Sequence, residues 1–202
     1  MLMRSIQKIL FEDGHAGVTL WRMQGAPPIT IRPAKDADME AVTAIYAHHV
    51  LHGGASFETE APSAADMRRR RADVVARGLP YLVATEDGSV VGYAYASLYR
   101  LRAAYANTVE NSVYVRPDAT GRGIGQRLLS ALIDACEASG LRQMVAVVGD
   151  SANVASTRLH EKLGFRRVGV LTNVGFKHGR WLDSVLLQRE LGEGARTPPE
   201  RR

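Results

Sequence analysis

Three glycines at alternate positions are the feature of this 202-residue sequence whose chemistry is most direct. Gly121, Gly123 and Gly125 follow an apolar run that ends at Arg116 and precede helical spacing over residues 126–139. Glycines let backbone N–H groups turn toward one point, and a helix start adds about half a positive charge there. Such a loop can cradle a pyrophosphate. The spacing is not G-x-G-x-x-G, so a dinucleotide fold is disfavoured, and an ordinary glycine loop stays the alternative.

Two ionisable residues near this loop could move protons. Glu110 interrupts an otherwise apolar and small-residue strand predicted over residues 108–115, and His160 falls on a helix predicted over 154–163. A lone glutamate in a strand is ordinarily an exposed edge residue, and a histidine on a helix is often a satisfied structural one. Both types serve as general acids or bases where a cleft receives them.

A cationic and aromatic loop precedes the Glu110 strand. Arg100, Arg102 and Tyr105 lie in it, and guanidinium groups bind carboxylates and phosphinates in a forked geometry. The two arginines could therefore bind an anionic group.

Other charged groups are weaker candidates. His48 and His52 share a helix face with no suitably spaced acidic ligand, so no metal site is predicted. The net charge is +5, but the arginines at 68–71 lie on a helix opened by the capping box Ser63–Asp66 and have no interleaved aromatic residues. They are interpreted as a solvated face, and the positive charge as suited to a polyanionic small molecule rather than nucleic acid.

Several motifs together resemble the GNAT acyl-CoA N-acetyltransferases. The glycine loop and the segment from Asn153 to Phe165 match that family's two signature segments, although Thr120 stands where Gln or Arg is usual. Four further segments resemble the group of this family that acetylates phosphinothricin and methionine sulfoximine: residues 108–115, 145–149, 175–183 and the acidic-aromatic stretch 57–60. The resemblance covers about residues 30–190.

The resemblance implies acetyl-CoA as co-substrate and gives each motif a role. It makes Glu110 the base and His160 a second catalytic residue, which orients substrate, relays a proton or protonates the CoA sulfur. Substrate is bound by Arg100, Arg102, Tyr105 and Phe57, with Glu58 beside them and Lys177 and His178 reaching in from a neighbouring subunit. The cofactor-binding residues are Val113, Tyr114, Val115, Gly121, Arg122, Gly123, Ile124, Gly125, Gln126 and Asn153.

The implied reaction is direct attack by the α-amino group of a small amino acid or analogue on acetyl-CoA. A positioned base must first deprotonate that amine, and no acyl-enzyme is required. The alternatives are a protein or peptide N-acetyltransferase and a non-catalytic acyl-CoA-binding module. The group also implies a homodimer.

Composition bounds the rest. The chain is 46% hydrophobic and has no run long enough for a membrane span, and its one cysteine, Cys136, lies on an apolar helical stripe that indicates a core thiol. We expect a cytoplasmic protein with an N-terminal extension over residues 1–28, one domain over 29–191 and a disordered tail over 192–202.

The elements that must position these residues follow from periodicity and turn signals. Helices are predicted from Asp36 to Gly53, from Ser63, and over residues 126–139 and 154–163. Strands are predicted over residues 29–32, 81–86, 90–98, 108–115, 144–148, 168–171 and 184–188. This order predicts one mixed α/β domain with helices on both faces. The resemblance specifies it as the GNAT fold, a mixed, mostly antiparallel sheet of six to seven strands, in which the fourth and fifth strands are parallel and splay apart around the cofactor.

Overall fold

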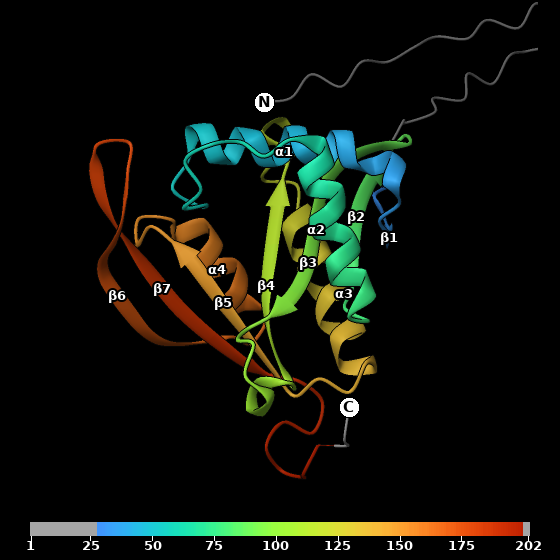
Figure 1. The fold of residues 1–202 in the computed structure, drawn as a ribbon, viewed down its shortest axis with the longest axis vertical. Coiled ribbons are helices and arrows are strands. Elements are labelled where there is room, and N and C mark those ends of the chain that lie inside the picture. The colour runs from blue at the N-terminus through green and yellow to red at the C-terminus, as the bar shows by residue number, and fades with distance from the viewer. Residues whose placement is uncertain (1–27, 200–202) are drawn as a thin grey trace, which may run out of the picture.

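The computed structural model describes residues 28–199, which fold around one seven-stranded sheet (Figure 1). The strands lie in the order β1-β2-β3-β4-β5-β7-β6. Their bounds are β1 Thr30–Pro33, β2 Tyr81–Glu86, β3 Ser89–Leu98, β4 Thr108–Val115, β5 Gln143–Gly149, β6 Arg166–Lys177 and β7 Arg180–Glu190. All neighbouring pairs are antiparallel except β4 and β5, so the predicted fold class is confirmed.

Four helices cover the two faces of the sheet: α1 Met39–His52, α2 Ala64–Ala76, α3 Ile124–Ala138 and α4 Val154–Lys162. In Figure 1, α1 and α2 lie in front of the sheet, and α3 and α4 lie behind it. Helix α3 buries its apolar stripe on the sheet, including Leu128, Leu132 and Cys136, which have no exposed surface. The predicted core position of Cys136 is confirmed.

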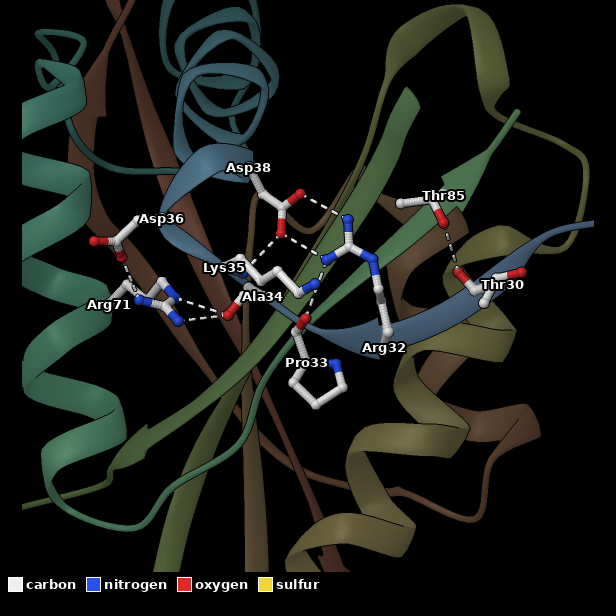
Figure 2. Close-up of polar contacts among 9 residues, drawn as sticks. All are labelled: Thr30, Arg32, Pro33, Ala34, Lys35, Asp36, Asp38, Arg71 and Thr85. Carbon is white, nitrogen blue, oxygen red and sulfur yellow. Dashed lines mark hydrogen bonds and ion pairs between the residues drawn. The ribbon is translucent and has the colours of Figure 1, made fainter. Parts of the chain in front are cut away.

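The start of α1 differs from the prediction. Asp36 does not cap this helix: a short 3₁₀ turn, η1 Asp36–Asp38, precedes α1, and Asp36 pairs with Arg71 of α2. The buried Asp38 instead accepts two hydrogen bonds of 2.7 Å from Arg32 of β1 (Figure 2). Arg71 also donates to the Ala34 carbonyl, so these two arginines join β1 to both front helices.

The last two strands are much longer than predicted. The sequence indicated strands over residues 168–171 and 184–188, whereas β6 and β7 form a hairpin that turns at His178 and Gly179. Glycines at 169 and 175 and a pairing irregularity between Leu171 and Gly175 break the alternation in β6. Most of β6 is also exposed, so no inward-facing pattern marks it as a strand.

The ends of the chain bear on the domain prediction. Residues 1–27 and 200–202 lie outside the described residues, and so does most of the predicted extension. After β7, residues 192–199 fold back toward Arg142, whose guanidinium donates to Thr197 at 3.1 Å. No helix within residues 28–199 has the length and apolar character needed to cross a membrane.

Candidate active site

The two central strands separate halfway along their length. β4 and β5 pair only from Thr108 with Gln143 to Asn111 with Ala146. Beyond that point β4 continues to Val115 paired only with β3, and β5 continues to Gly149 paired only with β7. The predicted splay is therefore present, and it leaves backbone groups of both strands facing a gap.

The backbone of β4 presents N–H groups to this gap. Arg116 donates its N–H to Val91 of β3 at 2.9 Å, and N–H directions alternate along a strand. The N–H groups of Val113 and Val115 consequently point away from β3, toward the gap. His49 of α1 donates from Nε2 to the Val115 carbonyl at 2.9 Å, which accounts for one acceptor that β5 no longer satisfies.

A cavity of about 440 Å³ passes through the gap. Of the predicted site residues, Phe57, Glu110, Val113, Tyr114, Asn153 and His160 line it. The others do not, namely Val115, the glycine loop from Gly121 to Gln126, and the loop residues Arg100, Arg102 and Tyr105. Further lining residues were not predicted from the sequence; those with polar side chains are Tyr46, Ser56, Tyr95, Asn111, Ser112, Ser156 and Ser184.

Successive residues of β4 serve opposite faces of the sheet. Tyr114 contacts Tyr46 of α1 with ring centroids 5.0 Å apart, so Glu110 and Ser112, which share its parity, also face the front helices. Asn111, Val113 and Val115 face α3 and α4 behind the sheet. The cavity is thus open to a carboxylate from one face and to α4 from the other.

Glu110 is half-buried on the front face. Burial raises the pKa of its carboxyl, and the positive charge of Arg100 partly offsets that effect. A raised pKa makes a carboxylate a stronger proton acceptor. If the rise is modest, the carboxylate also stays ionised near neutrality. Glu110 therefore has the environment of a general base rather than that of an exposed edge residue.

His160 approaches from the rear face and is deeply buried, with 4% of its surface exposed. Its Nδ1 lies 2.8 Å from the Ser156 carbonyl oxygen and its Nε2 lies 3.0 Å from Oδ1 of Asn111. Burial lowers the pKa of the ring, and the Ser156 carbonyl opposes that change. Both ring nitrogens therefore have hydrogen-bond partners within the protein, so the geometry favours a role in which His160 acts through Ser156 or Asn111 and not by direct contact with a substrate.

Residues 55–58 form the front wall of the cavity, and the β6–β7 hairpin holds this segment there. The Phe57 ring lies against Gly149 and Gly175, where an added Cβ would come within 3.0 and 2.4 Å of it. Lys177 of β6 donates from Nζ to the carbonyls of Gly53 and Ser56 at 3.0 and 2.6 Å. Lys177 is thus buried and bound to backbone carbonyls of its own chain.

Glu58 belongs to the same wall and is already paired. Its carboxylate accepts a 3.0 Å hydrogen bond from the Tyr46 hydroxyl and a 2.6 Å bond from Arg70 of α2. The other arginines of the 68–71 run also have acidic partners, Glu40 for Arg68, Asp66 for Arg69 and Asp36 for Arg71. Arg69 and Asp66 both belong to α2, whereas the other three ion pairs link α2 to other elements, so the run is not simply a solvated face.

The glycine loop meets the N-terminus of α3 behind the sheet. Gly121 and Gly123 have φ values of 74° and 76°, and a Cβ at either position would meet nothing within 4 Å. Helix α3 starts at Ile124, two residues earlier than predicted, and Gly123 is its N-cap. Gly125 lies inside the helix, where a Cβ would meet Leu159 of α4 at 3.4 Å. Two glycines thus open the loop and the third permits close helix packing.

Side chains around this loop are turned away from it. Thr120 donates its hydroxyl to the Pro117 carbonyl at 2.9 Å, and Arg122 pairs with Glu86 of β2. Asn153 caps α4 by accepting a 3.2 Å hydrogen bond from the Ser156 N–H. An anion at this loop would therefore meet backbone donors and the positive end of α3.

The loop between β3 and β4 lies near Glu110 but outside the cavity lining. Arg100 stacks over the Tyr99 ring at 4.7 Å, and Tyr105 meets the edge of the same ring. Arg100 is close enough to Glu110 to influence its pKa. The structure thus places one predicted substrate-binding arginine beside the carboxylate, without a direct contact to the cavity.

Metal ligands are not assembled in the described part of the chain. The rings of His48 and His52 lie 4.8 Å apart, and residues 28–199 contain no group of three or more His, Cys, Asp or Glu side chains arranged to hold a metal ion.

Fold and site together define a mixed α/β protein in which a splayed parallel strand pair lies between a glycine loop at a helix N-terminus and a half-buried carboxylate. The model of the acetyltransferase (GNAT) family matches residues 45–165. A crystal structure of a GNAT phosphinothricin acetyltransferase from Sinorhizobium meliloti in complex with AcCoA superposes with a TM-score of 0.83. The two proteins share 47% sequence identity, and the match covers 86% of this chain and 94% of the chain in that crystal structure. The chain belongs to the GNAT acetyltransferase family.

Two curated relatives are similar over most of their length. The phosphinothricin N-acetyltransferase of Alcaligenes faecalis is 55% identical over 171 residues, which are 85% of this chain and 87% of the relative. The L-methionine sulfoximine/L-methionine sulfone acetyltransferase of Salmonella typhimurium is 44% identical over 170 residues, which are 83% of this chain and 97% of the relative.

Proposed function

We propose that this acetyltransferase moves an acetyl group from acetyl-CoA to the α-amino group of a small amino acid or analogue of the phosphinothricin, methionine sulfoximine or methionine sulfone type. The observation that carries the proposal is the cavity between β4 and β5, which Glu110 reaches from the front face. The names of both relatives and of the Sinorhizobium meliloti structure support this substrate class.

Residues behind the sheet fit the co-substrate. The open, positive-φ glycines at 121 and 123 and the N-terminus of α3 suit a pyrophosphate, and the free-facing N–H groups of Val113 and Val115 suit an extended amide chain and a carbonyl. Acetyl-CoA supplies the acyl group as an activated thioester. Asn153 and the N–H groups of Val113 and Val115 would hold its reactive end.

Glu110 does the proton chemistry on the front face. A free α-amino group is mostly protonated near neutrality, so its proton must leave before the nitrogen lone pair can attack. The Glu110 carboxylate, with its pKa raised by burial, accepts that proton directly or through one water. The neutral amine then attacks the thioester carbonyl without an acyl-enzyme, the C–S bond breaks as the amide forms, and CoA leaves as a thiolate that takes up the second amine proton. Arg100 and Arg102 attract the substrate's acidic groups to this face.

A substrate panel tests the proposal. CoA release is measured with phosphinothricin, methionine sulfoximine, the matching amines that lack the carboxylate, and a short peptide with a free N-terminus. We expect turnover of the amino-acid analogues and much higher KM values for the decarboxylated amines. Preferred acetylation of the peptide would replace the substrate class, and acetyl-CoA binding without turnover of any amine would indicate a non-catalytic module.

We also propose a homodimer formed through the β6–β7 hairpin. β6 is the last strand of the sheet, so one edge of its backbone is unpaired. Large apolar side chains are exposed along the hairpin, with Val174 and Phe176 of β6 and Trp181 of β7 showing 51, 59 and 60% of their surface. A second copy would cover both the edge and these side chains.

A further inference from the structure

The Asn111 side chain spans the point where β4 and β5 separate. Asn111 is the last residue of β4 that pairs with β5, and 6% of its surface is exposed. Its Nδ2 donates to the Val145 carbonyl of β5 at 3.2 Å, and its Oδ1 lies 3.0 Å from Nε2 of His160 on α4. One amide thus connects both splayed strands to the helix behind them.

Hydrogen-bond directions at this amide are fixed by the backbone. The Val145 carbonyl can only accept, so the amide nitrogen of Asn111 must face it and the amide oxygen must face His160. That oxygen also only accepts, so the hydrogen bond requires a proton on Nε2 of His160.

The second nitrogen of His160 meets the same requirement. Nδ1 lies 2.8 Å from the Ser156 carbonyl, which can only accept. Both contacts are hydrogen bonds at once only when the ring carries two protons, and in the neutral ring one of them sets a lone pair against an oxygen. Burial disfavours the doubly protonated ring, and the Ser156 carbonyl opposes that effect. The Asn111 oxygen, at 3.0 Å from Nε2, is a second acceptor that fits the same protonated form.

The other surroundings of His160 carry no charge close to the ring. The edge of the ring meets Phe165 with centroids 5.0 Å apart. From β7, the Arg189 guanidinium binds the Leu163 carbonyl, beyond the end of α4. On α4 itself Glu161 and Lys162 are exposed, and Glu110 lies on the other face of the sheet. The Asn111 oxygen is therefore the group of β4 that contacts the His160 ring and can influence its protonation.

We propose that Asn111 is a positioning residue for the reaction assigned above, which fixes the orientation and the protonation of His160 from the edge of the cavity. The proposal rests on the proposed function only for its effect on turnover. Asn111 keeps the proton on Nε2 of His160 and keeps the ring beside the cavity. Its hydrogen bond to the Val145 carbonyl also fixes the point where β4 and β5 separate.

Histidine titration tests the proposal without reference to activity. In the isotope-labelled full chain, the His160 resonance is followed from pH 4 to 9 by NMR. Asn111→Asp places a carboxylate at Nε2 and should raise the pKa of His160, whereas Asn111→Ala removes the acceptor and should lower it. Asn173→Asp adds the same charge on β6, at a residue outside the cavity lining, and should leave the His160 titration unchanged.

Turnover of the preferred amine tests the catalytic part. Asn111→Ala should lower kcat about tenfold or more, with a smaller change in the KM for acetyl-CoA. In a His160→Ala background the same substitution should have little further effect, because its influence passes through the ring.

Three results would overturn the proposal. They are pKa changes of the same sign in both Asn111 variants, no pKa change in either, or strictly additive losses of kcat in the double variant. If the parent chain acetylates none of the amines tested, the proposed function fails on its own, and the opposite pKa changes still decide the contact between Asn111 and His160.

Discussion

Glu110 and Asn111 are adjacent in the chain but belong to opposite faces of the sheet. The side chain of Glu110 lies with the front helices, near Arg100, whereas Asn111 binds His160 behind the sheet. In the proposed reaction, this alternation lets one strand present a base to the amine and a hydrogen-bonded pair to the co-substrate. The division of labour depends on the gap, because in an unbroken sheet the two faces would be sealed from each other.

Replacement of Glu110 by glutamine tests the base. Glu110→Gln keeps size and hydrogen bonding but cannot accept a proton, so kcat at pH 7 should fall by roughly 10²–10⁴. The loss should shrink as pH rises, because free amine becomes abundant. In the parent, activity should fall as pH drops through the Glu110 pKa, which burial raises above its ordinary range. Steady-state kinetics from pH 4 to 10 measure both effects.

Glu40→Gln is the matched control, since Glu40 lies on α1 and contacts Arg68 at the surface. Its turnover should equal that of the parent, and the acetyl-CoA KM of Glu110→Gln should be little changed. Turnover near the parent value in Glu110→Gln at neutral pH would remove Glu110 from the proton transfer.

Residue type and the family resemblance indicated Glu110, His160 and Phe57, and the structure brings all three to one cavity. Neither revealed Asn111 or Tyr95, because their roles depend on where two strands cease to pair. Nothing in the local sequence at Asn111 marks the end of the parallel pairing. The strand alternation alone would have shown that Glu110 and Asn111 face opposite sides.

At the scale of elements, the glycine loop and α3 form one unit. Gly123 is the N-cap in a left-handed conformation, and Gly140 has nearly the same φ, 74°, just beyond the other end of the helix. Neither position would bring a Cβ within 4 Å of another group. The two glycines therefore allow the same substitution at opposite ends of the helix dipole.

Aspartate at these two positions separates cofactor binding from stability. Gly123→Asp strains the backbone at a positive φ, although Asp adopts this conformation more readily than most residues, and it places a negative charge at the favourable end of α3. These two effects oppose each other, so the Tm of the unliganded protein should change little. The same charge repels a pyrophosphate, so the Tm increase on adding acetyl-CoA should largely disappear. For the parent that increase corresponds to about 2.7 kcal/mol at a hundredfold excess over Kd.

Gly140→Asp should behave in the opposite way. A negative charge near the C-terminus of α3 should lower the Tm of the unliganded protein slightly, and the acetyl-CoA-induced increase should remain. Thermal melts of the three proteins with and without acetyl-CoA provide the measurement. Equal increases in the parent and in Gly123→Asp would place the pyrophosphate elsewhere.

The β6–β7 hairpin controls the cavity wall through Phe57. A Cβ at Gly175 would lie 2.4 Å from the Phe57 ring, so Gly175→Ala should displace that ring and raise the KM for the amine several-fold. The KM for acetyl-CoA should change little, because its predicted site lies behind the sheet. Gly169→Ala on the same strand meets nothing within 4 Å and serves as the control. An unchanged amine KM in Gly175→Ala would exclude Phe57 from the substrate site.

The helices and the first five strands follow closely from periodicity and turn signals, whereas the hairpin does not. β6 lacks a buried face, since Val168, Leu171, Val174 and Phe176 are all exposed. Strand prediction relies on burial that alternates along one chain, and here any burial of these side chains would come from outside the chain.

At the scale of the whole molecule, the exposed apolar surface of this hairpin is what distinguishes a monomer from the proposed dimer. A single copy leaves apolar side chains of β6 and β7 in contact with water, including the ring pair of Phe176 and Trp181 with centroids 5.3 Å apart. Covering such a surface is favourable by roughly 25 cal/mol per Å² of apolar area. The same hairpin holds the cavity wall through Lys177 and Gly175, so pairing two copies would also stiffen the substrate side.

A charge in the centre of this surface should therefore break the dimer and weaken substrate binding together. Phe176→Glu would place a carboxylate in the dimer interface, where desolvation of an unpaired charge costs several kcal/mol, so the protein should sediment as a monomer. Leu101→Glu introduces the same charge at a residue with 87% of its surface exposed in the β3–β4 loop, and should leave the dimer intact. Sedimentation velocity over a range of concentrations measures both, and the amine KM of Phe176→Glu should rise with its dissociation. A parent protein that sediments as a monomer at micromolar concentration would rule out this interface, and the exposed face of β6 would then need another partner.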